Sequence, residues 1–356
     1  MSGKYRAVGW NRQKKMYDRL LLGSITAVAA AFIGTTILVR PGYPFETFLL
    51  RATSLSAFLL LHVILCIGPL ARLNPKFLPL LYNRRHLGVT MFLLALVHAA
   101  FATGYYHAQG VVNPLVSVFT AYKSDYAALT GATAISHLPF EPFGALALVI
   151  LFLMAATSHD FWLRVLGASI WKTLHVGVYV AYGAAVAHVA LGVLQSERNP
   201  MLAVLMACGL ALVLGLHLVA QAKEARTDRA GASPEADGFI RTCAVSDLSE
   251  GHGKTVRLGA DRRAIYLHEG RVFALSNVCR HQGGPVGEGR ILDGCVTCPW
   301  HGWQYLPETG TSPPPFHEVL DTYPIRIHDG VVYVNPAPNP PEHRSSGAPI
   351  TKEGAR

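Results

Sequence analysis

Charged residues are scarce in this chain. They make up 15% of its 356 residues, whereas soluble domains typically carry about 25%. The deficit is uneven, because residues 20–221 hold most of the apolar side chains and residues 222–356 have an ordinary soluble composition. This scarcity argues against a wholly soluble protein and predicts a membrane domain followed by a soluble domain.

Cysteines and acidic residues are also few. The six cysteines do not have the dense spacing of a secreted disulfide framework, so we expect the soluble part in a reducing compartment. Only 22 acidic residues oppose 31 basic ones, which leaves a net charge of +9. Excess positive charge can indicate nucleic-acid binding, but here the basic residues flank apolar runs, which is typical of membrane proteins. We therefore expect membrane lipid as a partner, and no nucleic acid.

Apolar runs of roughly 20 residues, the length that crosses a bilayer, predict an all-α bundle of six transmembrane helices in residues 20–221. The fourth run is short, although its apolar stretch starts near Leu138. No signal-peptide cleavage site follows the first run, which is long enough to stay in the bilayer. The six runs are 20–39, 48–70, 87–106, 143–158, 173–194 and 200–221.

Lysine and arginine predict the orientation of these spans. Fifteen of them lie before the first span, between spans two and three, between spans four and five, and just after span six, against four on the other side. Because positive residues stay on the cytoplasmic side, we expect a multi-pass protein of the bacterial inner membrane. Residues 1–19 would be a cytoplasmic N-terminal segment, and the C-terminal domain would be cytoplasmic as well.

The soluble part begins with a polar linker, residues 222–238. Short runs such as "AIYLHEGRVFALS" and "DGVVYVNP", each with a turn signal, then predict a small all-β antiparallel domain over residues 239–337. The proline-rich residues 338–356 predict a disordered tail.

Two cysteine- and histidine-containing motifs in this domain predict a metal centre. The segment "CVTCPWHGWQY" alone is compatible with half a zinc knuckle, a redox CxxC pair or an iron–sulfur loop. A structural zinc site usually needs two paired knuckles, and Cys279-x-His281 is too short for one. Without Cys295, the pattern is Cys279-x-His281, sixteen residues, then Cys298-x-x-His301. Two thiolates and two imidazoles suit a [2Fe–2S] centre in which each pair holds one iron.

The motifs "CRHQGG" and "CPWHGW" resemble the two cluster-binding loops of the Rieske family, and "SPPPF" is similar to its proline loop. This resemblance implies that Cys279 and Cys298 bind one iron and that His281 and His301 bind the other. Cys295 is then a bystander, most simply a buried strand residue.

Departures from the respiratory branch of that family indicate a ferredoxin-type domain. Gly284 and Trp300 stand where the respiratory branch has an extra disulfide, and Trp303 replaces a hydroxyl residue. Fewer hydrogen bonds to the cluster sulfurs predict a potential at the low end of the Rieske range. Only about twenty residues follow the domain, so the large iron domain of a Rieske oxygenase is not expected.

Histidines within the apolar runs are functional candidates, because ionisable groups are costly in a bilayer. His86 and His98 lie twelve residues apart in span three, and His175 and His188 thirteen apart in span five. These separations, roughly 18–20 Å along a helix, suit two levels of paired imidazoles and hence one or two b haems. The angular offsets are unfavourable, about 120° and 140°, unless a local deformation near Gly183 corrects span five.

His98 with His188 is the stronger pair because both lie deep in the bilayer. His86 lies beside two arginines and is compatible with a plain interfacial residue. His62 in span two is an alternative ligand for the inner haem. His107 and His137 fall in the long outer loop 107–142, which is a candidate site for an acceptor or quinone, although we expect both to be solvated loop residues.

The segments "RRHLGVTMFLLALVH" and "TSHDFWLRVLGASIWKTLHVGVYVAYGAAVAH" resemble the ferric reductase-like transmembrane family. Within it they are similar to the membrane subunit that feeds electrons to periplasmic methionine sulfoxide reductase. The resemblance implies haem ligands at His98, His175 and His188, and it does not assure His86. No glycine-rich phosphate loop opens a helix after residue 222, so no flavin and nicotinamide domain is expected.

Together these patterns predict an electron relay without a substrate-transforming site of its own. A cytoplasmic reductase or ferredoxin-like donor would reduce the cluster, and haem b would pass the electrons to a periplasmic acceptor or quinone. Two alternatives stay open: reverse flow from quinol to a cytoplasmic Rieske-dependent acceptor such as an oxygenase, and a redox sensor.

Overall fold

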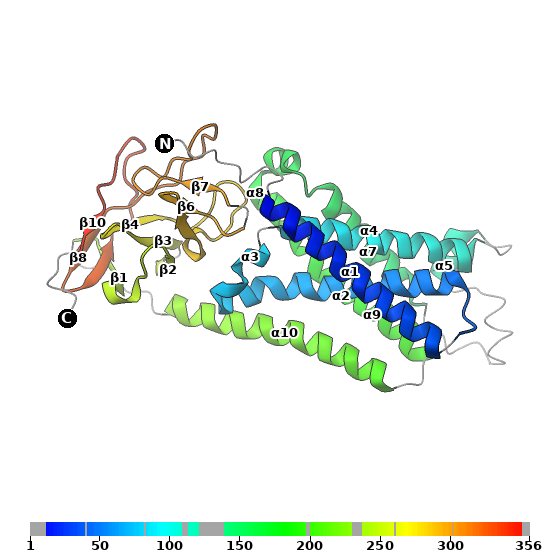
Figure 1. Ribbon diagram of the computed structural model, residues 1–356. Coiled ribbons are helices and arrows are strands. Elements are labelled where there is room, and N and C mark those ends of the chain that lie inside the picture. Colours follow the sequence, from blue (N-terminus) through cyan, green and yellow to red (C-terminus); the bar gives the residue numbers. More distant parts are fainter. Residues whose placement is uncertain are drawn as a thin grey trace. The chain divides into compact units, whose positions relative to one another are not determined.

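The computed structural model describes residues 12–39, 41–81, 83–108, 113–120, 139–196, 200–229, 237–259, 261–300 and 302–350. Helices occupy the first part of the chain and antiparallel strands the second (Figure 1). The predicted fold class, a helical region followed by a small β domain, is confirmed. The chain separates into two compact units, one containing the whole β domain and the other most of the helices.

Five described helical segments are long and apolar enough to cross a membrane. Three of them lie in α1 (Arg12–Val39), α2 (Phe45–Leu73) and α10 (Pro200–Arg229). Another starts in α4 (Arg84–Ala102), and the last runs from α8 (Asp160–Val176) into α9 (Val178–Ser196). The protein is therefore a multi-pass membrane protein.

The fourth predicted span is the 16-residue helix α7 (Glu141–Ala156). At 1.5 Å per residue it is about 24 Å long, less than the roughly 30 Å of a bilayer core. The count of six spans therefore stays a prediction. Helix α10 continues to Arg229, so the first part of the expected linker is helical. Short helices fill the connections: η1 (Pro75–Phe77), α3 (Leu78–Leu81), η2 (Thr103–His107) and α5 (Pro114–Thr120).

Helix α7 packs against both α4 and α9 (Figure 1). Most of its side chains are apolar, and Ala147 and Leu151 are its buried residues. On α9 the small residues Ala181 and Ala184 are buried, which lets neighbouring helices approach closely. The arrangement places His98 and His188 on two helices that both contact α7, α4 and α9.

A break between α8 and α9 separates His175 from His188. Gly177 ends α8, where its amide donates to the Leu174 carbonyl at 3.0 Å, and α9 starts at the next residue. A Cβ atom at Gly177 would lie 2.9 Å from that carbonyl oxygen. The deformation expected near Gly183 therefore occurs at Gly177. Because the helix is interrupted there, the offset of about 140° calculated for one continuous helix does not apply to His175 and His188.

The β domain contains three small antiparallel sheets. One has the order β1-β9-β8, with β1 at Ile240–Ala244, β8 at Ile325–His328 and β9 at Val331–Val334. The second has the order β10-β4-β3-β2, with β2 at Gly253–Leu258, β3 at Asp261–His268, β4 at Arg271–Ser276 and β10 at Ala348–Pro349. The third has the order β5-β6-β7, with β5 at Arg290–Leu292, β6 at Cys295–Thr297 and β7 at Gln304–Tyr305.

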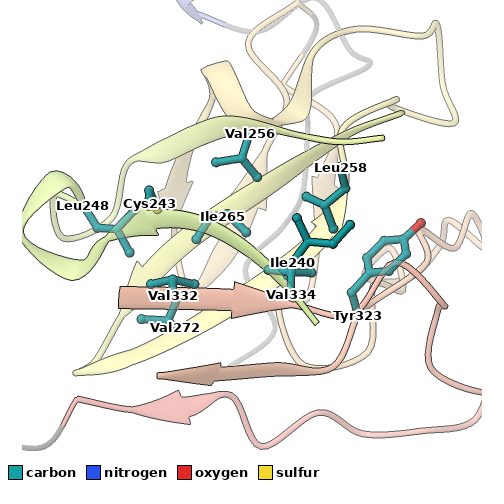
Figure 2. Packing of buried hydrophobic residues seen from close by; sticks show 11 residues of the cluster. Ile240, Cys243, Leu248, Val256, Leu258, Ile265, Val272, Tyr323, Val332 and Val334 are labelled. Atoms are coloured by element: carbon teal, nitrogen blue, oxygen red, sulfur yellow. The ribbon is translucent and has the colours of Figure 1, made fainter. Parts of the chain in front are cut away.

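Two apolar cores support these sheets. The first lies between the β1-β9-β8 sheet and the β2, β3 and β4 strands, where side chains such as Ile265, Val272 and Val332 point toward one another (Figure 2). Cys243 belongs to this core. The second core includes Tyr266, Leu275 and Val296 and continues into the two cysteine loops. The two cysteine loops are thus supported by a packed apolar core.

The predicted disordered tail, residues 338–356, is ordered up to residue 350. Strand β10 pairs with β4, with Ala348 opposite Val272. The Ile350 amide donates to the Gly270 carbonyl at 3.0 Å, and Ala348 is buried. The proline-rich composition led to the wrong prediction here because these backbone groups find partners on an exposed strand edge.

Candidate functional site

The two cysteine loops of the β domain share one backbone design. The amide of Cys279 donates to the Gly284 carbonyl at 2.9 Å, and the amide of Gly283 donates back to the Cys279 carbonyl at 2.7 Å. Cys298 repeats both bonds, with Trp303 and Gly302, at 2.8 and 2.9 Å.

In each loop the glycine four residues after the cysteine has a positive φ, 69° and 72°. Glycine adopts this conformation without the steric cost that other residues have. Two matching turns therefore each present a cysteine sulfur.

The loops bring the two sulfurs close together. Cys279 and Cys298 are both 2% exposed. A Cβ atom at Gly284 would lie 2.8 Å from the Cys298 Sγ and 3.0 Å from the Trp300 ring. Glycine, which has no Cβ atom, is thus the residue that allows the two loops to approach each other at position 284. The glycine that replaces a respiratory-branch cysteine has a packing role.

Tyr305 binds the first cysteine, which the sequence motifs did not predict. Its hydroxyl oxygen accepts from the Arg280 amide at 3.0 Å and lies 3.2 Å from the Cys279 Sγ. Because that amide is a donor, the tyrosine hydrogen is available to the sulfur. Tyr305 is completely buried in strand β7, so this bond is shielded from water.

Hydrogen bonding stabilises the thiolate of Cys279. Burial by itself raises the pKa of this thiol, but hydrogen bonds from Cys298, Tyr305 and the amides of His281 and Gln282 outweigh it and lower the pKa to about 7. The pKa of Tyr305 is raised, chiefly by burial and then by the neighbouring Cys279. Such a pair favours an anionic sulfur, the form that binds iron.

Trp303 connects the histidine of the first loop to the proline loop. Its ring stacks on His281 with centroids 4.2 Å apart and planes 9° apart. Its Nε1 atom donates to the Ser312 hydroxyl at 3.0 Å, and Phe316 packs against it at 4.3 Å. The segment "SPPPF" therefore braces the histidine side of the site.

The donor atoms fit a [2Fe–2S] cluster. The Nδ1 atom of His281, which belongs to the first cysteine loop, is buried. Cys295 lies in β6, is 7% exposed and makes no part of either turn, as predicted. His301 lies outside the described residues. Among the described residues no three His, Cys, Asp or Glu side chains form a group that could hold one metal ion.

In the helical part, His98 and His188 lie close together. Their ring centroids are 6.4 Å apart. His98 Nδ1 is 3.1 Å from the Leu50 carbonyl, and His188 Nδ1 is 2.9 Å from the Phe140 carbonyl. A carbonyl oxygen only accepts, so each Nδ1 carries hydrogen and each neutral ring keeps its lone pair on Nε2. The separation suits two imidazoles that share one metal ion at bonds of about 2 Å.

Gly144 of α7 makes room for this pair. A Cβ atom there would lie 2.7 Å from His188 Nδ1 and 2.8 Å from the next ring carbon. The bond from His188 to the Phe140 carbonyl needs that space.

His175 has the same hydrogen-bonding design. Its Nδ1 atom is 2.9 Å from the Trp171 carbonyl, and the Trp171 ring stacks on it at 3.8 Å. Its Nε2 atom is buried and has no hydrogen-bond partner among the described residues. A buried nitrogen without a partner is costly, and a bound metal would remove that cost. Trp171 is itself fixed by a 2.8 Å bond to the Thr157 carbonyl.

The remaining two histidine candidates differ from these. His62 donates through Nδ1 to Phe58, and its Nε2 atom accepts from the Tyr182 hydroxyl at 3.1 Å. Both nitrogens are therefore used, which disfavours His62 as a ligand. His86 Nδ1 binds the Asp18 carboxylate at 2.9 Å, with 41% of its side chain exposed. A carboxylate behind an imidazole is compatible with metal binding and with an interfacial ion pair.

Comparison with known proteins assigns both parts. Residues 238–324 match the family model of the Rieske [2Fe-2S] domain, and residues 53–186 match that of the ferric reductase like transmembrane component. The chain is 31% identical over 105 residues to the ferredoxin component of the alkene monooxygenase system of Xanthobacter autotrophicus, covering 29% of this chain and 86% of the relative.

This chain joins a Rieske [2Fe-2S] domain to a ferric reductase-like transmembrane domain.

The Rieske domain also resembles other ferredoxins. It is 36% identical over 100 residues to the biphenyl dioxygenase ferredoxin subunit of a Pseudomonas species, covering 27% of this chain and 91% of that protein. A solved ferredoxin from Sphingomonas yanoikuyae B1 matches at 28% identity with a TM-score of 0.26, covering 28% of this chain and 99% of that one. The similarity to the methionine sulfoxide reductase subunit stays a prediction.

One polar residue of the ferric reductase-like domain departs from expectation. His107 was predicted to be a solvated loop residue, yet it is 5% exposed and its Nδ1 atom lies 2.8 Å from the Ser117 hydroxyl. The five-residue π-helix η2 (Thr103–His107) turns it inward. No residue pattern signalled that turn. His137 lies outside the described residues.

Proposed function

We propose that this protein relays single electrons across the bacterial inner membrane, from a cytoplasmic donor through the Rieske domain and b haems to an outer-face acceptor. A membrane electron-transfer role follows from the two families that the chain joins. The observation that carries the route is the pair His98 and His188, whose rings lie 6.4 Å apart inside the helical domain.

In the Rieske domain, Cys279, Cys298, His281 and His301 are the proposed ligands. The cluster supplies one-electron redox chemistry at a potential set by charge and by hydrogen bonds to sulfur. The protein residues exclude water from the two cysteines, orient His281 against Trp303, and donate a hydrogen bond from Tyr305.

In the helical domain, His98 and His188 are the proposed ligands of an outer haem. His175 is the proposed ligand of an inner haem, with His86 as its second ligand. Haem supplies one-electron chemistry through a bis-histidine iron. The backbone carbonyls of Leu50, Phe140 and Trp171 hold the three rings in the tautomer that leaves Nε2 basic.

The proposed orientation, with both termini in the cytoplasm, is supported by the distribution of Lys and Arg, fifteen against four. A cytoplasmic reductase or a ferredoxin-like protein is then the proposed donor, and a periplasmic redox protein or quinone the proposed acceptor.

Reverse flow is the second candidate, and one observation favours it. The similar ferredoxins are components of monooxygenase and dioxygenase systems. In that case quinol would reduce the haems and the Rieske domain would reduce a cytoplasmic oxygenase. Potentiometric titration separates the two directions: a cluster potential well above both haems supports reverse flow, and a lower or equal potential supports the outward relay.

The test uses the purified full chain in proteoliposomes. Iron and haem analysis with EPR should show one Rieske signal and low-spin haem, and the His98→Ala and His188→Ala variants should each lose the same haem signal. His62→Gln is the matched control, because its two nitrogens are already bonded, and it should keep the full haem content. A chain without haem, or variants that leave the spectrum unchanged, would refute the proposal.

A further inference from the structure

Three polar side chains come together at the end of the helical domain distant from His86. His107 ends η2, Ser117 lies in α5, and Glu141 begins α7. His107 and Ser117 are buried, and the Glu141 side chain is only 12% exposed. Polar groups are buried at a cost that hydrogen bonds or opposite charges must offset, so this grouping calls for an explanation.

The three side chains form a connected series. His107 Nδ1 lies 2.8 Å from the Ser117 hydroxyl, and His107 Nε2 lies 4.0 Å from Glu141 Oε1. A protonated His107 would therefore have a carboxylate partner on one side and a hydroxyl acceptor on the other. Histidine exchanges its proton near neutral pH.

The series continues to the proposed outer haem ligand. The Phe140 amide donates to Glu141 Oε2 at 3.1 Å, and the carbonyl of the same residue accepts from His188 Nδ1 at 2.9 Å. The Phe140 ring also packs against His188 at 5.2 Å. One residue thus contacts the carboxylate through its amide and the imidazole through its carbonyl. Phe140 is therefore the contact through which the His107 and Glu141 pair is joined to His188.

The helix geometry that places His107 is unusual. Residues 103–107 form a π-helix that continues α4, the helix that carries His98. Single π-turns often occur at functional sites, and this one turns His107 toward α5 and α7. The buried cluster is therefore a product of the same helix that supplies a proposed ligand.

We propose that His107 and Glu141 form a proton-binding site coupled to the redox state of the haem held by His98 and His188. The inference rests on the proposed function for that haem. When one electron arrives, His107 takes up one proton on Nε2 from the outer aqueous phase, and when the electron leaves, the proton returns. The added negative charge raises the proton affinity of His107, and the proton in turn stabilises the electron.

The neighbouring elements bring few other ionisable groups. Helix α5 has no charged residue, and Glu141 is the charged residue of α7. From α4 the nearest titratable residue along the chain is His98, and η2 itself also contains Tyr105 and Tyr106, which are exposed. Tyrosine ionises far above neutral pH, so among the described residues of η2, α5 and α7 His107 is the side chain that exchanges a proton near neutral pH.

The experiment is a spectroelectrochemical titration of the purified full chain at several pH values from 5 to 9, with proton uptake followed by a pH-indicator dye. The midpoint potential of one haem should fall with rising pH by up to about 59 mV per tenfold loss of protons. His107→Gln, which can still bond Ser117, should flatten that slope and abolish the uptake. Glu141→Gln should move the sloping region to lower pH, because His107 loses the carboxylate that stabilises its charge.

Glu46→Gln is the matched control, because it removes a carboxylate at the start of α2 and should leave the slope unchanged. A wild-type midpoint that does not vary with pH, or a slope that persists in His107→Gln, would overturn the proton site while the haem spectrum stays intact. Missing haem in the wild type would instead overturn the proposed function. If His107→Gln loses haem, the displacement expected in Glu141→Gln decides the question, and no displacement would refute the coupling.

Discussion

Replacing Tyr305 with phenylalanine should lower the midpoint potential of the Rieske cluster. The tyrosine hydroxyl lies 3.2 Å from the Cys279 Sγ and its hydrogen is directed there by the Arg280 amide. A donor to sulfur stabilises the reduced cluster more than the oxidised cluster, because reduction adds negative charge. The phenylalanine ring fills the same buried space without that donor.

The magnitude follows from the strength of such a bond. Hydrogen bonds to charged groups are worth about 1.5–3 kcal/mol. If about half of that energy differs between the two redox states, the change is about 0.7–1.5 kcal/mol. One tenfold step, about 1.4 kcal/mol, corresponds to about 59 mV for one electron. The expected fall is therefore about 30–60 mV.

The assay is an EPR-monitored redox titration of the full chain, with iron content confirming that the cluster is retained. Tyr266→Phe is the matched control. Tyr266 is equally buried, but its hydroxyl donates to the Val286 carbonyl and not to a sulfur. The reasoning fails if Tyr305→Phe leaves the potential unchanged or raises it, or if Tyr266→Phe lowers it by as much.

Three other changes test the packing and the charges. Gly284→Ala should abolish cluster incorporation, since its Cβ would lie 2.8 Å from the Cys298 Sγ; iron analysis should find less than a tenth of the wild-type content, and full occupancy would contradict the packing argument. Gly144→Ala should displace His188 and halve the haem content measured by the pyridine haemochrome assay or lower it further, and a normal content would argue against the role of that space. Burial raises the pKa of Glu288, so the folded Rieske domain loses stability as pH rises from the unfolded to the folded pKa. Glu288→Gln should remove that loss and raise the thermal midpoint at pH 8, read from the visible absorption of the cluster, but not at pH 4.

The two cysteine loops could be recognised from the sequence because their pattern is local. Two cysteines and two histidines at fixed spacings suggest the proposed donor set, and the turns at Gly283 and Gly302 are encoded within each loop. Tyr305 was missed because its role depends on strand β7 folding back beside the first loop. A hydroxyl residue seven positions after Cys298 was the available signal.

The helical domain was harder to predict because tertiary contacts decide which nitrogen of each histidine is used. The sequence offered His175 as a ligand of the inner haem and left His62 open as an alternative to His86 for its second ligand. The structure distinguishes His62 from His175, since the Tyr182 hydroxyl occupies Nε2 of His62, while Nε2 of His175 is buried and has no hydrogen-bond partner among the described residues. The break at Gly177 was expected six residues later, because a glycine pattern shows where a helix is free to deform and not where packing deforms it.

Strand β10 has a practical consequence for anyone who modifies this chain. A reporter or protease site inserted at residue 337 would separate β10 from β4, where Ala348 pairs with Val272, and would expose the edge of β4. Exposed strand edges promote pairing between molecules, and the aggregation of such a fusion protein would be mistaken for a failure of membrane insertion. Labels for topology mapping belong beyond Ile350, where they leave the closing strand in place.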